Sequence, residues 1–428
     1  MKRIVGYLTS LLLIASIITA CTVNPVTGDR QFSLMSTEQE LAIGQQHYVP
    51  SQQAQGGRYV VDPELTLYVN QVGQRLAEVS DRPELPYEFV VLNNDVPNAW
   101  ALPGGKMAIN RGLLIHLEDE AQLAAVLGHE IVHAAARHGA TQQTRNVLLQ
   151  AGMLAAGVAA VSQEWEYGAL AVGALGVGAT AWQARYSRSH ELEADRYGVD
   201  YMVRTGYDPQ GAVELQETFL KFSEGRNPNW LEGLFASHPP SRERMRLNQE
   251  LADENPGGAR NRDAYRRATA QLRRDQPAYE RYQEALSAAE KGEYGKAMGL
   301  VEQAIEHQPR ENLFWELQGR LFAQDEREKD AIAAFDRAIE ANPEFFRPLV
   351  YRGVLHKRQG NARQAENDLT ASQKLLPTQL ASYHLGELAL ERGARDEAIQ
   401  HFRMAASGGG ELGAAAERQL QQLGANAG

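Results

Sequence analysis

Small residues and prolines recur at a fixed interval in the C-terminal part of this 428-residue chain. Proline recurs every 34 residues, at Pro309, Pro343 and Pro377. Alanine recurs at the same interval, which is one residue shorter at the last step. These alanines are Ala297, Ala331, Ala365 and Ala398. A 34-residue period predicts stacked helix pairs, because small residues let paired helices approach closely and a proline closes each unit. We therefore expect an α-solenoid in this region.

The period resembles that of tetratricopeptide repeats. About four units fit between residue 278 and the C-terminus, and the last is irregular around residues 407–410. A generic helical array without a ligand is the alternative. Because such solenoids usually present a concave binding surface, we expect the repeats to bind a protein or peptide partner.

A second pattern, HEIVH at residues 129–133, predicts a metal site on a helix. Residues four apart share a helix face, so His129 and His133 can offer two imidazole nitrogens to one ion. Glu130 is rotated away from both but points toward the space beside the metal, where a carboxylate can take a proton from bound water. The five residues can arise by chance in a helix-rich chain, so the assignment needs a third ligand downstream.

The third ligand is expected within the segment HELEAD, residues 190–195. Glu191 and Asp195 are four apart and share a helix face, whereas Glu193 lies about 200° from Glu191 and points elsewhere. We assign Glu191 as the ligand and Asp195 as the carboxylate that orients a ligand histidine, expected to be His129. His190 is a rival ligand, and a solvated acidic helix face is the alternative for the whole segment.

The charge and the cysteine content narrow the possible class of protein and the possible type of metal site. The chain has 54 acidic and 43 basic residues, a net charge of -11, and no basic cluster, which argues against a nucleic-acid binder. Cys21 is the single cysteine, so no intrachain disulfide can form. Any zinc ion must therefore be held by histidine and carboxylate.

The N-terminus is typical of an export signal. Lys2 and Arg3 precede a largely apolar run at residues 4–18, and the sequence ITAC then ends at Cys21. This resembles a bacterial lipobox, in which the cysteine is lipidated and becomes the mature N-terminus. An uncleaved membrane anchor is the alternative. Thr22 stands where an aspartate would resemble an inner-membrane retention signal, so we expect the periplasmic face of the outer membrane.

Local patterns predict two helices and a strand before the HEIVH segment. Residues 37–40, TEQE, fit a capping box that opens a helix. A second helix starts at Asp62 and Pro63, because a capping residue followed by proline is typical of a first turn. Its apolar stripe consists of Leu65, Val69, Val72 and Leu76. Residues 87–92 are β-branched and aromatic and predict a strand.

Residues 98–110 predict a turn followed by a short strand at residues 107–110. An ordinary hairpin is the alternative. Beside a metal-binding helix, such a strand could be the sheet edge that pairs with an extended peptide through backbone hydrogen bonds. That mode of binding makes few sequence demands and suits a substrate that is unfolded.

Two neighbouring features are less informative. We expect the helix that carries HEIVH to run over residues 118–138, with His138 off the ligand face as a surface or cap histidine near its C-terminus. Residues 151–181 are rich in Gly, Ala and Val and form two apolar pieces, each too short to span a bilayer. One prediction is a helical hairpin that covers the cleft or dips into the membrane surface. The alternative is a pair of ordinary core helices.

Together these motifs resemble the zinc metallopeptidase family of the CAAX prenyl protease and HtpX type. Two more segments match the family in the expected order, NAWALPGG at residues 98–105 and SHPPSRER at residues 237–244. The resemblance implies that His238 lies near the metal, as an electrophile toward the oxyanion or as a removable fourth ligand. It implies that Arg244 binds substrate or the oxyanion. The alternatives are a turn histidine and a surface arginine.

A peptidase followed by repeats resembles the periplasmic, BepA-like branch of this family. The resemblance implies that the repeats dock the β-barrel assembly machinery or a stalled barrel, and that the peptidase degrades failed clients. Members of that branch are exported soluble chains, whereas this sequence carries a lipidation signal at Cys21.

The predicted architecture is mainly α. It comprises a signal peptide at 1–20, a tether at 21–35, a zincin-like α+β metallopeptidase domain with a small sheet at 36–252, a linker or linking helix at 253–277 and the tetratricopeptide-repeat solenoid at 278–428.

The predicted function is a zinc metalloendopeptidase of the bacterial cell envelope, with one Zn²⁺ per chain. Two histidines and one glutamate leave zinc an open position for water, whose pKa then falls toward about 7. Glu130 accepts the proton and delivers it to the leaving amine. One alternative is a lipid-anchored scaffold or chaperone with a silent or structural zinc site. Another is a peptidase for short peptides, for which the repeats would be superfluous.

Overall fold

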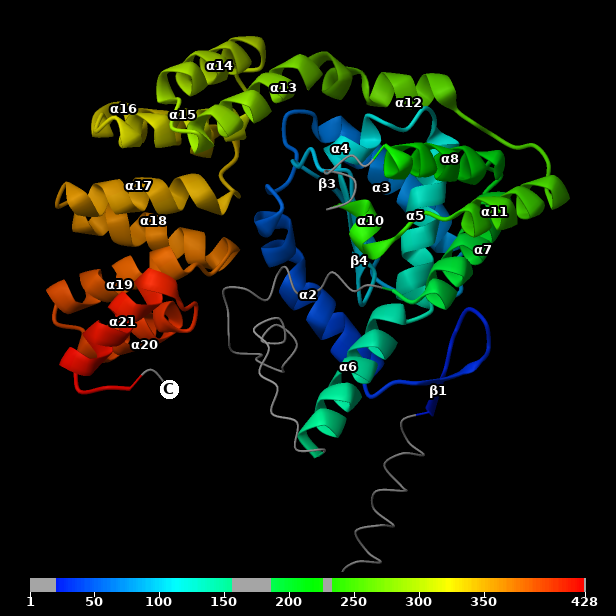
Figure 1. Cartoon of the computed structure of the whole chain (residues 1–428), viewed down its shortest axis with the longest axis horizontal. Helices are drawn as coiled ribbons and strands as arrows, with labels where there is room; N and C mark the ends of the chain where they lie inside the picture. The colour runs from blue at the N-terminus through cyan, green and yellow to red at the C-terminus, as the bar shows by residue number, and fades with distance from the viewer. Residues whose placement is uncertain (1–20, 156–185, 226–232, 427–428) are drawn as a thin grey trace, which may run out of the picture.

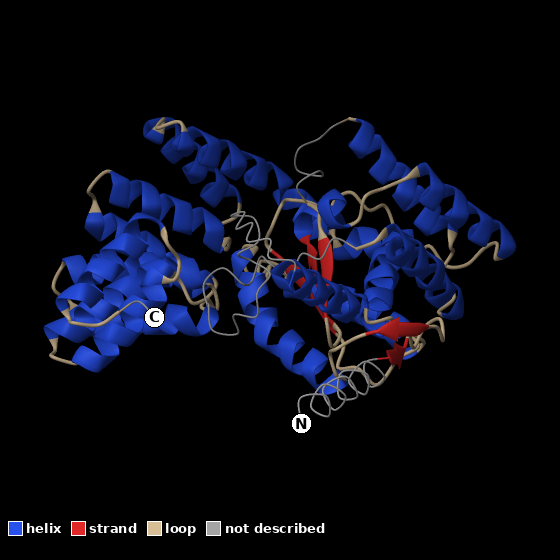
Figure 2. Cartoon of the chain, turned by 60° about the horizontal axis from the view of Figure 1, so that its bottom comes forward, coloured by secondary structure: helices blue, strands red, loops and turns tan. Residues whose placement is uncertain are grey.

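The computed structural model describes residues 21–155, 186–225 and 233–426. A peptidase-like unit with a small sheet is followed by a curved array of paired helices (Figure 1). Figure 2 shows how few strands there are among the helices, as the mainly α prediction requires. The elements of the first unit are β1 Cys21–Val23, β2 Arg30–Phe32, α2 Thr37–Ala54, α3 Pro63–Glu78, β3 Glu88–Leu92, β4 Ala99–Leu102, β5 Lys106–Asn110, α4 Arg111–Leu114, α5 Glu120–Ala135, α6 His138–Ala155, α7 Arg188–Arg204, α8 Gln210–Glu224, α10 Leu234–Ser237 and α11 Arg242–Glu254.

The first two long helices begin at cap residues, as the sequence predicts. The capping box of α2 lies one position earlier than expected, because Ser36 is the N-cap and exchanges hydrogen bonds with Gln39. Asp62 precedes α3, with Pro63 in its first turn. The predicted apolar stripe of α3 is fully buried, at Leu65, Val69, Val72 and Leu76. This helix packs against β3 and α5 in the main core.

The sheet has three strands in the order β3-β5-β4. Strand β5 pairs in parallel with β3 and antiparallel with β4, so the expectation that residues 107–110 form an edge was wrong. The edge nearest α5 is β4, which the sequence analysis took as part of a turn. A turn with Gly104 and Gly105 at positive φ joins β4 to β5, a conformation that glycine adopts without strain.

Helix α5 ends earlier than predicted. Arg137 has φ 64°, which interrupts the helix after Ala135, and α6 begins at His138. The Arg137 side chain forms an ion pair with Glu40 and donates to the Met35 carbonyl over 2.6 Å. These buried contacts hold a left-handed residue that a regular helix would exclude.

The segment expected to be a tether, residues 21–35, contains a small hairpin. Strands β1 and β2 pair antiparallel, with Cys21 opposite Phe32. Gln31 Nε2 donates to the Ala136 carbonyl over 3.2 Å, and the Leu34 amide donates to Thr144 Oγ1 over 3.0 Å. The hairpin is therefore attached to the region where α5 gives way to α6.

The repeats form helix pairs, as the 34-residue period predicts. The period alanines are fully buried between paired helices, at Ala297, Ala331, Ala365 and Ala398. The segment at 253–277, expected to be a linker or linking helix, is partly helical, since it holds α12 and the start of α13. The elements are α12 Arg262–Ala268, α13 Ala270–Glu290, α14 Tyr294–His307, α15 Asn312–Gln324, α16 Glu328–Ala341, α17 Phe346–Arg358, α18 Ala362–Leu375, α19 Gln379–Glu391, α20 Arg395–Ala406 and α21 Gly410–Gln422.

The array is attached to the first unit through a buried polar cluster. Glu311 accepts hydrogen bonds from Tyr279 Oη over 2.5 Å and from Asn93 Nδ2 over 2.8 Å. The guanidinium of Arg111 lies 3.5 Å from the Tyr279 ring centroid. A second contact joins Gln53 of α2 to the Glu344 carbonyl over 2.6 Å. One hydrophobic core runs from the peptidase-like unit into the first repeats.

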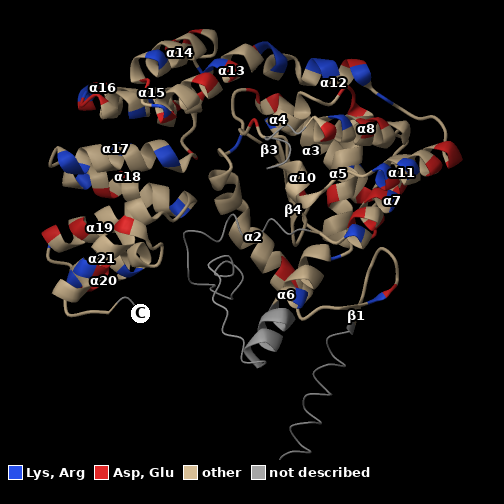
Figure 3. Cartoon of the chain, in the orientation of Figure 1, with Lys and Arg blue, Asp and Glu red and all other residues tan. Residues whose placement is uncertain are grey.

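Charged residues of both signs are distributed along the chain. Figure 3 shows basic and acidic residues interspersed along the helices of both units. Among the described residues, no helix has the length and apolar character needed to cross a membrane. Most of the Gly- and Ala-rich segment at 151–181 lies outside the described residues.

Candidate metal centre

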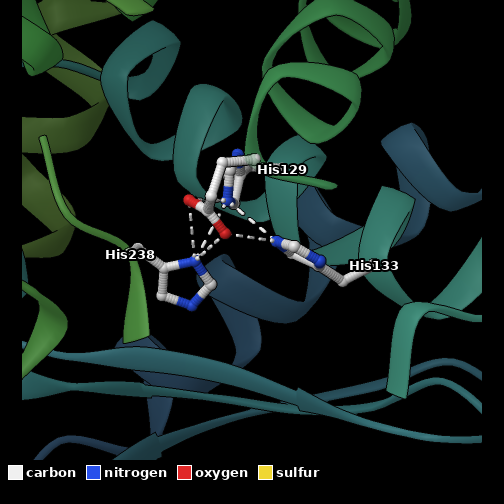
Figure 4. Close-up of side chains that lie close together, drawn as sticks. His129, His133 and His238 are labelled. Carbon is white, nitrogen blue, oxygen red and sulfur yellow. Dashed lines mark hydrogen bonds and ion pairs between the residues drawn. The ribbon is translucent and has the colours of Figure 1, made fainter. Parts of the chain in front are cut away.

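Four buried side chains converge beside α5 (Figure 4). His129 and His133 project from one face of α5, Glu191 comes from the first turn of α7, and His238 follows α10. One ligand-type atom from each residue lies within 4.8 Å of the other three. The sequence analysis singled out all four residues for this site.

The spacing of these atoms fits a four-coordinate metal ion. His129 Nε2 lies 3.0 Å from His133 Nε2 and 3.2 Å from His238 Nδ1. Glu191 Oε1 lies 3.1 Å from His238 Nδ1 and 3.4 Å from His133 Nε2. Ligands held at about 2.0–2.2 Å in a tetrahedron are roughly 3.3 Å apart, as in zinc sites of His and carboxylate. The donor set therefore matches a metal ion in both chemistry and geometry.

Asp195 and Arg244 support this cluster from behind. Asp195 Oδ1 lies 3.0 Å from His129 Nδ1, the pairing that the sequence analysis expects. Arg244 donates to Asp195 through Nε over 2.6 Å and through Nη2 over 2.7 Å, and its Nη1 lies 2.8 Å from Glu191 Oε2. Because its guanidinium is engaged and only 4% exposed, its surroundings differ from the substrate-facing position implied by resemblance.

His138 is not a surface histidine, so that expectation was wrong. It is 1% exposed, and its Nδ1 lies 2.8 Å from His133 Nδ1. The break at Arg137 turns the chain after α5 and brings His138 back toward the ligand, which a continuous helix would not allow. Its Nε2 lies 3.2 Å from Glu193 Oε1, so Glu193 also faces this region rather than solvent.

Glu130 lies beside the cluster and not within it. Its carboxylate is buried, and Oε1 lies 3.5 Å from His238 Nε2. Its Oε2 has no hydrogen-bond partner among the described residues. A buried carboxylate oxygen without a partner, next to a candidate metal site, is suited to accept a proton from water.

Comparison with known proteins now identifies the two units. Residues 63–252 match the sequence model of peptidase family M48, and residues 282–344 and 352–418 match a tetratricopeptide-repeat family. The chain carries a peptidase family M48 domain followed by tetratricopeptide repeats. The expected metallopeptidase and tetratricopeptide-repeat families and the mainly α fold class are thereby confirmed.

Curated relatives of this chain are proteases by name, and two of the three described here are named as metalloenzymes. The beta-barrel assembly-enhancing protease of Escherichia coli K12 is 30% identical over 268 residues, covering 58% of this chain and 52% of that protein. The mitochondrial metalloendopeptidase OMA1 of Schizosaccharomyces pombe is 34% identical, covering 54% and 66%. Metalloprotease YcaL of Escherichia coli is 31% identical, covering 40% and 66%. The chain spans about half the length of the assembly-enhancing protease.

Electrostatics in the M48 domain favour a bound cation. Burial alone would lower the pKa of His129, but Glu191 and Asp195 raise it to about 9. Burial lowers the pKa of His133 well below its usual value. Burial opposes ionisation of Glu191, yet His238 and His129 hold its pKa well below the usual range. A metal ion entering at neutral pH therefore displaces a proton from His129.

An apolar pocket lies next to Glu130 in the M48 domain. It has an open volume of about 30 Å³, and His129, Glu130 and His238 line one side of it. Its apolar walls are formed by Val126, Met202, Leu215, Phe219 and Leu234. A pocket of this size beside the Glu130 carboxylate has room for only about one or two water molecules.

Sequence reasoning missed one aromatic residue of the M48 site. The Tyr186 ring stacks on His133 with centroids 3.8 Å apart and planes at 17°. Tyr186 lies just before α7, and no spacing rule links it to α5. Its aromatic character, directly ahead of the segment with the third ligand, was the only available signal.

Proposed function

We propose that this chain is a zinc-dependent endopeptidase of the bacterial cell envelope that degrades misfolded or misassembled outer-membrane proteins. The observation that carries the proposal is the buried group of donor atoms from His129, His133, Glu191 and His238, with Glu130 beside it. The family of residues 63–252 supports peptide-bond hydrolysis as the reaction.

In this mechanism the chain supplies a base and a positioned metal site. A zinc ion held by His129, His133 and Glu191 would act as a Lewis acid and lower the pKa of water. Glu130 takes the proton of the attacking water on its free Oε2 and passes it to the leaving amine. Asp195 orients His129, and Arg244 neutralises the carboxylates of Asp195 and Glu191.

We further propose that His238 is a removable fourth ligand. Its Nδ1 lies among the other donor atoms, at 3.2 Å from His129 Nε2, so the arrangement described here is a resting form. His238 follows the short helix α10 and precedes two prolines, outside any long helix. A change in this connection can withdraw the imidazole and leave the open position that catalysis requires.

Substrate binding is assigned to the edge strand β4. Strand β4 lies next to α5 and has a neighbour on only one side in the three-stranded sheet of the described residues. An extended peptide can add to this edge through main-chain hydrogen bonds, with little demand on sequence. That mode favours unfolded segments over folded domains.

Recruitment is assigned to the repeats. The name of the beta-barrel assembly-enhancing protease associates that relative with β-barrel assembly. We propose that the repeats of this chain recruit unfolded envelope proteins or the β-barrel assembly machinery. A lipid on Cys21 would hold the enzyme at the periplasmic face of the outer membrane.

The test is casein cleavage by the full chain and two variants, with zinc content measured for each. Glu130→Gln should retain one zinc per chain and lose at least about 100-fold in activity, because only the base is removed. His238→Ala should retain zinc and cleave faster than the parent if the histidine holds a resting form. Loss of zinc from Glu130→Gln would contradict its assigned role.

A non-enzymatic scaffold is the competing function, and the four-donor arrangement favours it specifically. A permanently held fourth ligand would leave no site for water, so the zinc would be structural. In that case the parent and His238→Ala both hold one zinc and neither cleaves casein nor an unfolded β-barrel protein. Cleavage by either one excludes the scaffold.

A further inference from the structure

A line of polar contacts connects the N-terminal hairpin to a candidate metal ligand. Asn24 Nδ2, in the hairpin, donates to Glu193 Oε1 over 2.7 Å. The same carboxylate oxygen lies 3.2 Å from His138 Nε2. His138 Nδ1 in turn lies 2.8 Å from His133 Nδ1. Three contacts therefore connect Asn24, three residues after Cys21, to the candidate ligand His133.

The order of these contacts assigns the proton on each imidazole. His133 directs Nε2 to the metal position, so this nitrogen must be free of a proton, and Nδ1 carries one. His138 Nδ1 must then accept, which leaves the His138 proton on Nε2. This nitrogen has no hydrogen-bond partner among the described residues, and the Glu193 carboxylate, 3.2 Å away, acts on it through its charge. A carboxylate at Glu193 is the group that favours this tautomer of His138, and thereby the ligand form of His133.

Stacked rings limit rotation of both histidines. The His190 ring lies on His138 with centroids 4.2 Å apart and planes at 12°. Tyr186 stacks on His133 in the same manner. The rings are thus held in plane by stacking, and the polar contacts decide which nitrogen faces which neighbour.

Asn24 is fixed on its other side by the hairpin itself. It is 5% exposed, and its Oδ1 accepts from the amides of Val26 over 2.9 Å and Thr27 over 3.4 Å. This turn aims the amide nitrogen at Glu193. Because Oδ1 and Nδ2 have separate partners, the turn and the contact with Glu193 can be altered independently.

We propose that the hairpin at residues 21–32 is a positioning element of the metal centre, in which Asn24 acts through Glu193 and His138 to hold His133 in its ligand form. The inference rests on the proposed function, since it requires a metal at His133. It assigns Asn24, Glu193 and His138 as positioning residues. It also places the strand that begins at the proposed lipid attachment site, Cys21, within three contacts of the ligand.

The test removes one link of this line of contacts at a time in the full chain. Asn24→Asp keeps the oxygen that caps the turn but replaces the donor to Glu193 with a second carboxylate oxygen. Glu193→Gln, made separately, removes the carboxylate that contacts both Asn24 and His138 and keeps the size of the side chain. Asp29→Asn, at an exposed residue of the same hairpin, is the matched control for lost charge.

Two readouts follow the metal and not only activity. The first is the rate of zinc release to a chelator, and the second is the visible absorption spectrum of the cobalt-substituted protein. We expect Asn24→Asp to release zinc about tenfold faster and to shift the cobalt bands, as loss of outer contacts of metal ligands does elsewhere. Glu193→Gln should change both readouts in the same direction, and Asp29→Asn, which also loses one negative charge, should match the parent.

The outcomes separate this inference from the proposed function. A parent that holds zinc and cleaves casein, with Asn24→Asp unchanged in both readouts, overturns the positioning role alone. A change in Asn24→Asp with none in Glu193→Gln also overturns it, because the effect would then come from the hairpin and not through Glu193. A parent that takes up no zinc contradicts the proposed function and this inference with it.

Discussion

Arg244 illustrates how burial decides the role of a charged residue. Sequence resemblance suggests contact with substrate, yet the side chain neutralises Asp195 and Glu191 behind the ligands. Two buried carboxylates beside three histidines need a fixed cation when no metal is bound. We therefore interpret Arg244 as a positioning residue.

Removal of this cation should destabilise the fold and the metal site together. We expect Arg244→Ala to lower the free energy of unfolding by about 3–5 kcal/mol, since it leaves buried carboxylates unpaired. Arg246→Ala, at an exposed arginine of the same helix, should change it by less than about 1 kcal/mol. Chemical denaturation of the metal-free proteins measures both, and equal values for the two variants would contradict this role.

The same ion pair predicts a pH dependence. Burial would raise the pKa of Asp195, but Arg244 lowers it from 3.8 to about 2. The stabilisation is therefore present above the unfolded value and is lost as pH falls toward 2. In metal-free protein, the difference in unfolding free energy between parent and Asp195→Asn should be constant from about pH 7 to 5 and shrink by roughly 2 kcal/mol between about pH 4 and 2. A difference that stays constant down to about pH 2 would rule out this assignment.

Residue spacing predicts which side chains meet at the metal centre only where the helix that carries them is regular. His129 and His133, and Glu191 and Asp195, are pairs four apart within continuous helices, so their shared faces follow from the sequence. His138 was misplaced because Arg137 adopts a left-handed conformation that depends on tertiary contacts with Glu40. No local pattern encodes that break.

At the scale of elements, two glycines set the distance between α5 and α7. A Cβ on Gly198 would lie 3.0 Å from the His129 amide nitrogen, and one on Gly128 would lie 3.0 Å from the Gly198 carbonyl oxygen. Close backbone approach at this crossing brings Glu191 within reach of the two histidines.

A methyl group at this crossing should impair catalysis. We expect Gly198→Ala to lower kcat/KM for casein about tenfold, because a displacement of a few tenths of an ångström moves Glu191 relative to α5. Gly299→Ala, in a helix with open space around the glycine, should leave activity unchanged. Activity in Gly198→Ala equal to the control would show that the two helices tolerate separation.

Strand order is the element-scale feature that the sequence could not supply. The strand at residues 87–92 was predictable from its β-branched and aromatic residues, and the strand at 107–110 from its place after a turn. The parallel pairing of β3 with β5, however, joins segments separated by β4, and such pairing leaves no local signal. The edge was therefore assigned to the wrong strand. The helix pairs were predictable because each contacts its sequence neighbour.

At the scale of the molecule, the repeats and the M48 domain should unfold as one unit. We expect Glu311→Ala to lower the free energy of unfolding by about 3 kcal/mol, since Tyr279 and Asn93 would lose a buried acceptor. It should also expose a new cleavage site to limited proteolysis between the two units. Glu306→Ala, at an exposed residue of the preceding helix, is the control, and identical digestion of the two variants would contradict the coupling.

This attachment fixes the distance between the repeats and the edge strand β4. On the proposed function, a client held by the repeats reaches that strand only if enough slack chain remains between the two points. A client that folds promptly leaves too little unfolded chain to reach β4 and is released uncut. A client whose folding stalls keeps enough unfolded chain to reach β4 and is cleaved. The fixed spacing would make the enzyme a timer of folding, with the outcome set by two competing rates instead of by a recognition sequence.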